Sequence, residues 1–133
     1  MPRTGALLVL SREHHTSLVV ARDARRAANE KDVAALAEAI ARIEAHWKTV
    51  MAAHFDEEER LIRIAEDTLE AQAVARILAE HTELRALANG PCSLEPAMRL
   101  RRFADLIVTH VRFEERVFFP QLQSHPCIAN ADA

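Results

Sequence analysis

The chain has 133 residues, a formal net charge of −3 and an apolar content of 50%, which together indicate one domain, residues 1–133, with a substantial buried core. Its basic residues are interspersed with acidic ones, and this excludes a basic nucleic-acid-binding face or a membrane-surface patch. With two Gly and 5% aromatic residues, the composition favours packed helices over sheets.

The N-terminal region has one short apolar run, residues 6–10, which Arg12 and Glu13 closely follow. This run is too short for a signal-peptide core or a membrane span, so we expect a cytoplasmic protein. Cys92 and Cys127 form no CxxC pair, and we expect two reduced thiols rather than a disulfide or a thiolate metal site.

Four segments with helical periodicity follow one another along the chain. We expect helices over residues 10–28, 33–65, 69–88 and 96–119, separated by turn signals around residues 29–32, 66–68 and 89–96. Asp32 and Ser93 are candidate N-caps, and Pro120 is expected to end the last helix. Four helices with short connections predict an all-α, up-down-up-down antiparallel four-helix bundle, with residues 123–133 as a tail.

Each expected helix carries an apolar stripe at three- and four-residue steps, and one histidine interrupts each stripe. The stripes contain Leu7, Leu10, His14, Leu18, Ala21 and Ala28 in the first helix, Leu36, Ile40, Ile43, Trp47, Val50 and His54 in the second, Val74, Ile77, Leu78, His81, Leu84 and Ala88 in the third, and Leu100, Phe103, Ile107, His110, Glu114 and Val117 in the fourth.

The second and fourth helices carry the same motif. His54 and Glu58 are four residues apart, as are His110 and Glu114, so each pair lies on one face of its helix. A Glu-Arg dipeptide follows both pairs. A buried carboxylate without a partner is costly, and no Lys or Arg lies near enough on these stripes to pair with it. The pattern therefore predicts a metal site in the bundle core.

The residue types indicate which metal this site would hold. Imidazoles and carboxylates without a thiolate suit iron or manganese, and zinc as well. Two shared glutamates would lower the net charge of a buried centre with two ions. Four histidines and two bridging glutamates would leave open positions on octahedral ions for water, a bridging oxygen or a substrate.

Several neighbouring residues leave the exact ligand set open. His14 lies on the apolar stripe of the first helix, and His15 lies about 100° around the helix from it. If the stripe is counted from Leu18, which is three residues after His15, then His15 lies on the stripe instead. His46 is off the face of His54, and we expect a surface or rim residue that could replace a missing ligand. We expect His125 to be solvated. Glu57 and Glu59 are expected to be exposed or to orient the ligand imidazoles.

These residues resemble the hemerythrin-like family of HHE cation-binding domains over about residues 7–122. The carriers of the resemblance are Glu13-His14-His15, His54-Phe-Asp-Glu-Glu58, Glu80-His81, and His110 through the Phe-Phe-Pro120 that closes the last helix. The resemblance implies a four-helix bundle with two iron ions joined by an oxo or hydroxo bridge. It implies further that His14 and His54 bind one iron, that His81 and His110 bind the other, and that Glu58 and Glu114 bridge them.

Two positions depart from the oxygen carriers of that family. The carriers have a second histidine four residues after the one corresponding to His81, where this chain has Arg85. They also take their last carboxylate five residues after the helix-four histidine, where Glu115 stands, so Glu114 and Glu115 both remain candidates.

The resemblance implies a non-haem di-iron protein that binds or senses O2 or a related small diatomic or peroxide ligand. The departure at Arg85 leaves room for two alternatives. One is an enzyme that turns over peroxide or nitric oxide, or that donates iron for cluster repair. The other is a regulatory module that senses iron or oxygen and interacts with a partner. A redox partner and a homo-oligomer both stay open.

Overall fold

The computed structural model describes residues 3–131, which are almost entirely helical and contain no strand. The α-helices are α1 (Gly5–Glu30), α2 (Val33–His46), α3 (Ala52–Ala65), α4 (Ala71–Ala88), α5 (Pro96–Phe113), α6 (Phe119–Gln123) and α7 (Pro126–Ala131). Between them lie two π-helical turns, η1 (Trp47–Met51) and η3 (Glu114–Phe118), and one 3-10 turn, η2 (Glu66–Thr68).

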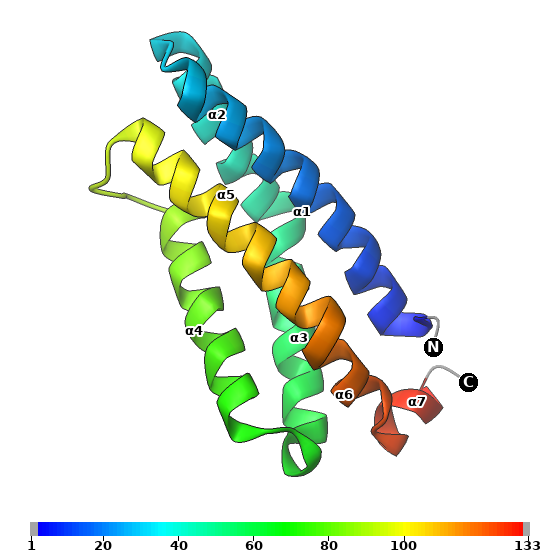
Figure 1. Ribbon diagram of the computed structural model, residues 1–133. Coiled ribbons are helices and arrows are strands. Elements are labelled where there is room, and N and C mark those ends of the chain that lie inside the picture. The colour runs from blue at the N-terminus through cyan, green and yellow to red at the C-terminus, as the bar shows by residue number, and fades with distance from the viewer. Residues whose placement is uncertain (1–2, 132–133) are drawn as a thin grey trace.

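The π turns join shorter helices into long ones. α2, η1 and α3 form one continuous helix, and so do α5, η3 and α6, so four long helices run up and down the molecule. Figure 1 shows α1 and α5 crossing in front of α3, with α4 on the outer side and α7 folded back at the end of the bundle. This arrangement confirms the predicted all-α bundle.

The observed helix ends agree with some of the predicted boundaries and differ from others. The second long helix covers residues 33–65 as expected, and the Asp32 carboxylate accepts a hydrogen bond from the Ala35 backbone N–H at 2.9 Å. The predicted cap at Ser93 was wrong. The N-cap of α5 is Glu95, because Pro96 is pre-organised for the first helical position. The first helix begins at Gly5 rather than at Leu10.

Pro120 does not end the last long helix, contrary to the prediction. In the π turn η3, the Phe119 backbone N–H donates to the carbonyl of Glu114. Pro120 has no N–H with which to continue this pattern to the carbonyl of Glu115. That carbonyl instead accepts a hydrogen bond from the Arg3 guanidinium at 2.7 Å, and the helix continues to Gln123.

Three residues assigned to the apolar stripes, Leu18, Leu78 and Val117, are exposed, and the exposed fraction of Leu78 is 39%. Leu18 is 36% exposed, because α1 packs through a face of small residues that includes Ser17, Ala21 and Ala24. Val117 is 42% exposed. Val117 lies within the wider π turn η3, which changes the direction of its side chains, so that Phe118 and Phe119 take the buried positions instead.

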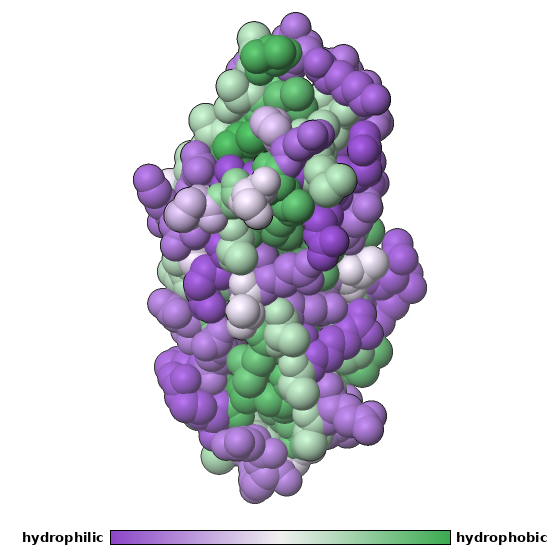
Figure 2. Space-filling view, turned by 90° about the vertical axis from the view of Figure 1, so that its left-hand side faces the viewer, coloured by the Kyte–Doolittle hydropathy of each residue, from purple (hydrophilic) through white to green (hydrophobic). Residues whose placement is uncertain are grey.

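The apolar core consists of two separate clusters. One contains Ile43, Leu100 and Phe103, among others, and the other contains Leu61 and Phe118. On every long helix the histidine of the stripe lies close to the point where residues of one cluster give way to residues of the other. In the second and fourth long helices the residue directly after the histidine, Phe55 or Val111, still belongs to the first cluster. Figure 2 shows a largely hydrophilic face on which apolar surface gathers in two stretches with a polar band between them.

None of the helices in the described part of the chain is both long enough and apolar enough to cross a membrane. The cytoplasmic location stays a prediction from the sequence.

Candidate metal centre

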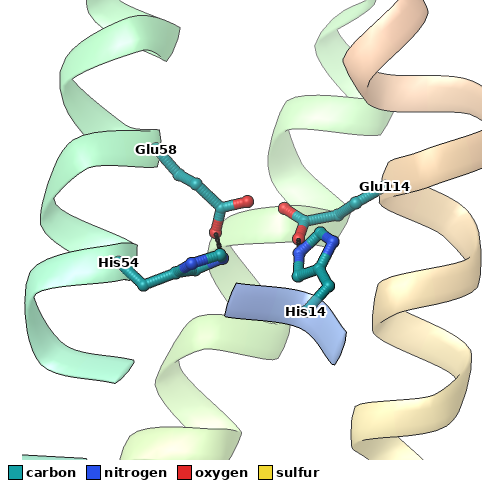
Figure 3. A group of neighbouring side chains, drawn as sticks. All are labelled: His14, His54, Glu58 and Glu114. Atoms are coloured by element: carbon teal, nitrogen blue, oxygen red, sulfur yellow. Dashed lines mark hydrogen bonds and ion pairs between the residues drawn. The ribbon is translucent and has the colours of Figure 1, made fainter. Parts of the chain in front are cut away.

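Six buried polar side chains meet at the level between the two apolar clusters. They are His14 from α1, His54 and Glu58 from α3, His81 from α4, His110 from α5 and Glu114 from η3. Figure 3 shows the carboxylates of Glu58 and Glu114 pointing toward one another, with His54 and His14 beside them. We call these six residues the cage.

Each cage carboxylate contacts two imidazoles through their Nε2 atoms. Glu58 Oε1 lies 3.3 Å from His54 Nε2 and 3.0 Å from His81 Nε2. Glu114 Oε1 lies 2.8 Å from His14 Nε2 and 3.1 Å from His110 Nε2. All four Nε2 atoms therefore face the interior of the cage.

The second oxygen of each carboxylate is buried without a hydrogen-bond partner. Glu58 Oε2 and Glu114 Oε2 are both in this state, as is His110 Nε2. Two carboxylates that face each other away from water cannot both stay charged unless a cation lies between them, because desolvation and mutual repulsion are both unfavourable. The cage therefore needs either a shared proton or a metal.

In the metal-free protein, bound protons balance the negative charge that metal ions would otherwise balance. Burial raises the pKa of Glu58 well above its usual range, and the neighbouring charge of Glu114 raises it further. Burial also opposes the ionisation of Glu114, but His110 and the hydrogen bonds to Glu114 outweigh it and hold the pKa of Glu114 well below its usual range. The pair thus keeps one proton on Glu58 and a negative charge on Glu114.

The histidines respond to the same field. Burial opposes protonation of His110, but contacts with Glu114 and Glu80 outweigh it and raise its pKa to about 10. The pKa of His14 is raised as well, because Glu114 and Glu115 outweigh burial. Burial, together with the positive charge of His110, lowers the pKa of His81 to about 4. The cage therefore stabilises positive charge on His14 and His110 and disfavours it on His81.

The donor atoms fit metal ions in two overlapping groups. His14, His54, Glu58 and Glu114 form one group, and Glu58, His81, His110 and Glu114 form the other. Within each group the ligand atoms lie within 4.8 Å of one another. Because both groups share both glutamates, either carboxylate could bridge two ions, and imidazole with carboxylate suits iron, manganese or zinc.

A second set of carboxylates lies outside the cage, one against the Nδ1 atom of each cage histidine. Glu13 Oε1 is 2.9 Å from His54 Nδ1, and Glu59 Oε2 is 2.9 Å from His81 Nδ1. Glu80 Oε1 is 2.7 Å from His110 Nδ1, and Glu115 Oε2 is 2.7 Å from His14 Nδ1. We call these four residues the outer carboxylates.

The sequence predicted that Glu57 and Glu59 are exposed or orient the ligand imidazoles. Glu59 contacts His81, whereas Glu57 pairs with Arg60, and the orienting position of the other three outer carboxylates was missed. Each outer carboxylate is the immediate sequence neighbour of a cage residue, because Glu13 precedes His14, Glu80 precedes His81, and Glu59 and Glu115 follow Glu58 and Glu114. This adjacency is the signal that could have identified them. The structure places Glu114 in the cage and Glu115 outside it.

Other candidate residues lie away from the cage. His15 is exposed and outside both groups. The Arg85 guanidinium is turned to the rim, 4.0 Å from Glu59 Oε2 and 5.5 Å from the centre of the Trp47 ring. The ligand group that contains His81 and His110 therefore receives no imidazole from position 85.

The predictions for two other histidines were wrong. His46 is buried, not at the surface, because its Nε2 atom lies 2.8 Å from the Ser17 hydroxyl at the contact between α2 and α1. His125 is buried, not solvated, because α7 folds back and places it 3.5 Å from Asp67.

Comparison with known families gives one match. The model of the hemerythrin HHE cation-binding domain matches residues 7–122. No curated protein and no solved structure matches the chain.

Proposed function

The chain belongs to the hemerythrin family of HHE cation-binding domains, and from that premise we propose that its cage holds two iron ions and binds O2 or a related small oxidant. The buried, unpartnered oxygens of Glu58 and Glu114 are the observation that carries the proposal. These two oxygens are available to coordinate metal, and both belong to glutamates that the two ligand groups share.

The cage residues would have separate tasks. The four Nε2 atoms would hold the ions in pairs, and the two carboxylates would join the pairs. Ferrous ions, when bound, would supply the electrons that reduce a small oxidant. On loading, Glu58, His14 and His110 would release the protons that they hold in the metal-free protein.

Aromatic rings limit the access of water to the cage. The Phe55 ring stacks on His81 with centroids 3.9 Å apart, and the Phe119 ring stacks on His14 at 5.1 Å. Both phenylalanines are buried. They close the apolar clusters against the polar layer, so an uncharged diatomic molecule would enter more readily than an ion.

Elemental analysis of protein reconstituted anaerobically with Fe(II) tests this proposal. We expect about two iron ions per chain, and a visible spectrum that changes on exposure to O2 and returns on reduction. His54→Ala and His110→Ala should each lose most of the iron, whereas His15→Ala, at an exposed position beside His14, should retain it. Unchanged iron content in the first two variants would contradict the assignment.

A second candidate function is turnover of peroxide or nitric oxide, and the position of Arg85 favours it. Arg85 points to Glu59 and Trp47 at the rim, so the His81–His110 group has one imidazole fewer than the carriers that the chain resembles. Catalytic consumption of peroxide or nitric oxide by the reduced protein would support turnover. A stable oxygenated form that releases O2 intact would exclude it.

A further inference from the structure

The outer carboxylates connect the helices in a closed order. Glu13 of α1 contacts His54 of α3, and Glu59 of α3 contacts His81 of α4. Glu80 of α4 contacts His110 of α5, and Glu115 of η3 contacts His14 of α1, which closes the circuit. Each long helix thus supplies a carboxylate to the histidine of the next one.

We propose that this closed belt of outer carboxylates positions all four cage histidines for metal and sets how strongly they donate to it. The proposal rests on the proposed function. Glu13, Glu59, Glu80 and Glu115 would be positioning residues, since they contact the imidazoles and not the centre of the cage.

The belt fixes the tautomer of each ring. A neutral imidazole carries one N–H, and a carboxylate that accepts at Nδ1 keeps the proton on that atom. In the neutral ring the lone pair is then on Nε2, which faces the cage in all four histidines. His14 and His110 would reach this form when they release their second proton on loading. Because the contacts are only 2.7–2.9 Å long, they also restrict rotation of the rings.

The belt also adds negative charge, which arginines hold in place at three positions. Arg76 Nε is 3.1 Å from Glu80 Oε2, and Arg3 Nη2 is 3.6 Å from Glu115 Oε1. Arg85 is the partner of Glu59, at 4.0 Å. An anionic acceptor makes an imidazole a stronger donor to a metal, and negative charge nearby favours the more highly charged oxidised ions.

The closed order makes a specific prediction about which histidine responds to each substitution. Glu80 is next to His81 in the sequence but contacts His110 on the neighbouring helix. Removal of its charge should therefore change His110 and leave His81 unaffected. Likewise, removal of the Glu59 charge should change His81 and not His54.

Two pairs of matched variants test the proposal. Glu80→Gln is compared with Glu83→Gln, since Glu83 lies three residues later on α4 and pairs with Arg102 at the surface. Glu59→Gln is compared with Glu57→Gln, since Glu57 lies on the same helix and pairs with Arg60. The measurements are Zn(II) affinity, the midpoint potential of the iron-loaded protein, and the imidazole ¹⁵N NMR spectrum of the metal-free protein.

We expect Glu80→Gln and Glu59→Gln to bind Zn(II) about 10–100-fold more weakly than their controls. The midpoint potential of the loaded variants should rise, a change that loss of packing alone would not give. In the metal-free spectrum the Nδ1 signal of His110 should shift in Glu80→Gln, while that of His81 stays unchanged.

Affinity and potential equal to those of the control variants would overturn the proposal, as would a shift at His81 instead of His110 in Glu80→Gln. Failure of the proposed function has a different signature, because wild-type protein would then take up neither Zn(II) nor Fe(II). In that event the spectrum of the metal-free protein would still decide whether the belt holds the histidines.

Discussion

His46 and His110 are both buried histidines, yet their surroundings shift their pKa values in opposite directions. Burial and the nearby charge of His54 lower the pKa of His46 to about 4. Its neutral ring pairs with the Ser17 hydroxyl. His110 faces two carboxylates, which raise its pKa to about 10 in spite of burial. A neutral histidine thus joins two helices, whereas a charged one marks the place of a cation.

The depressed pKa of His46 predicts that acid destabilises the fold. As the pH falls from about 6.5 toward about 4, the unfolded chain protonates His46 and the folded chain does not. The free energy of unfolding should therefore fall, with His46 contributing about 1–2 kcal/mol between about pH 7 and pH 5. Urea unfolding gives the free energy of unfolding of metal-free wild type and of His46→Gln at each pH. The contribution of His46 is the change with pH in the difference between these two free energies. A difference that does not vary with pH would contradict it.

Glu58→Gln should stabilise the metal-free protein and at the same time weaken metal binding. The raised pKa of Glu58 means that folding keeps a proton which the unfolded chain releases, so metal-free wild type loses stability as the pH rises above the usual glutamate range. Glutamine has no such cost. We expect the metal-free variant to be about 1–3 kcal/mol more stable at about pH 8 and to bind little iron. The control, Glu57→Gln, should change neither property, and lower stability of Glu58→Gln would contradict this reasoning.

Individual residues differed in how far the sequence could reveal them. The repeated His-x-x-x-Glu motif brings four cage residues onto two helix faces by spacing alone, and the structure places all four together. The partners of Glu13 and Glu80 could not be inferred in this way, since each contact spans two helices and depends on their relative rotation. Burial of His46 depended on a small partner, Ser17, which no apolar pattern identifies.

At the scale of secondary structure, both π turns lie at the cage. η1 ends at Met51, shortly before His54, and η3 begins at Glu114 itself. A π turn inserts one residue into a helix and changes the direction of the side chains that follow. The sequence predicted the continuous helices from periodicity, but it did not predict the π turns. They lack a sequence signal as strong as a capping residue, and their effect on Val117 was missed for that reason.

Arg3 should stabilise the end of the last long helix through the carbonyl that Pro120 leaves without a donor. Arg3→Ala is expected to cost about 1–2 kcal/mol in free energy of unfolding. In a Pro120→Ala background the restored backbone N–H can donate to the Glu115 carbonyl, so the cost of Arg3→Ala should be smaller. A double-mutant cycle by urea unfolding measures this coupling. Equal costs in both backgrounds would show that Arg3 acts only through its contacts with the Gln123 and Glu115 side chains.

At the scale of the whole molecule, metal binding should control stability. A ligand that binds only the folded chain adds about 2.7 kcal/mol when its free concentration is 100-fold above its Kd. For a domain of this size the corresponding rise in Tm is roughly 5–10 °C. Calorimetry with and without Zn(II), followed by a chelator, tests this expectation. The double variant His54→Ala, His110→Ala should show no rise, and a rise equal to that of wild type would place the stabilising metal elsewhere.

The cage also divides the hydrophobic interior, because each long helix contributes to both apolar clusters and changes from one to the other near its cage residues. In the metal-free chain a layer of partly charged groups separates the clusters, and little apolar contact couples them. We expect the two ends to open as separate cooperative units, each with its own free energy of amide hydrogen exchange. Metal would join them, since every ion would bind groups from several helices. The same ions that react with an oxidant would thereby make a molecule with two folding units behave as one.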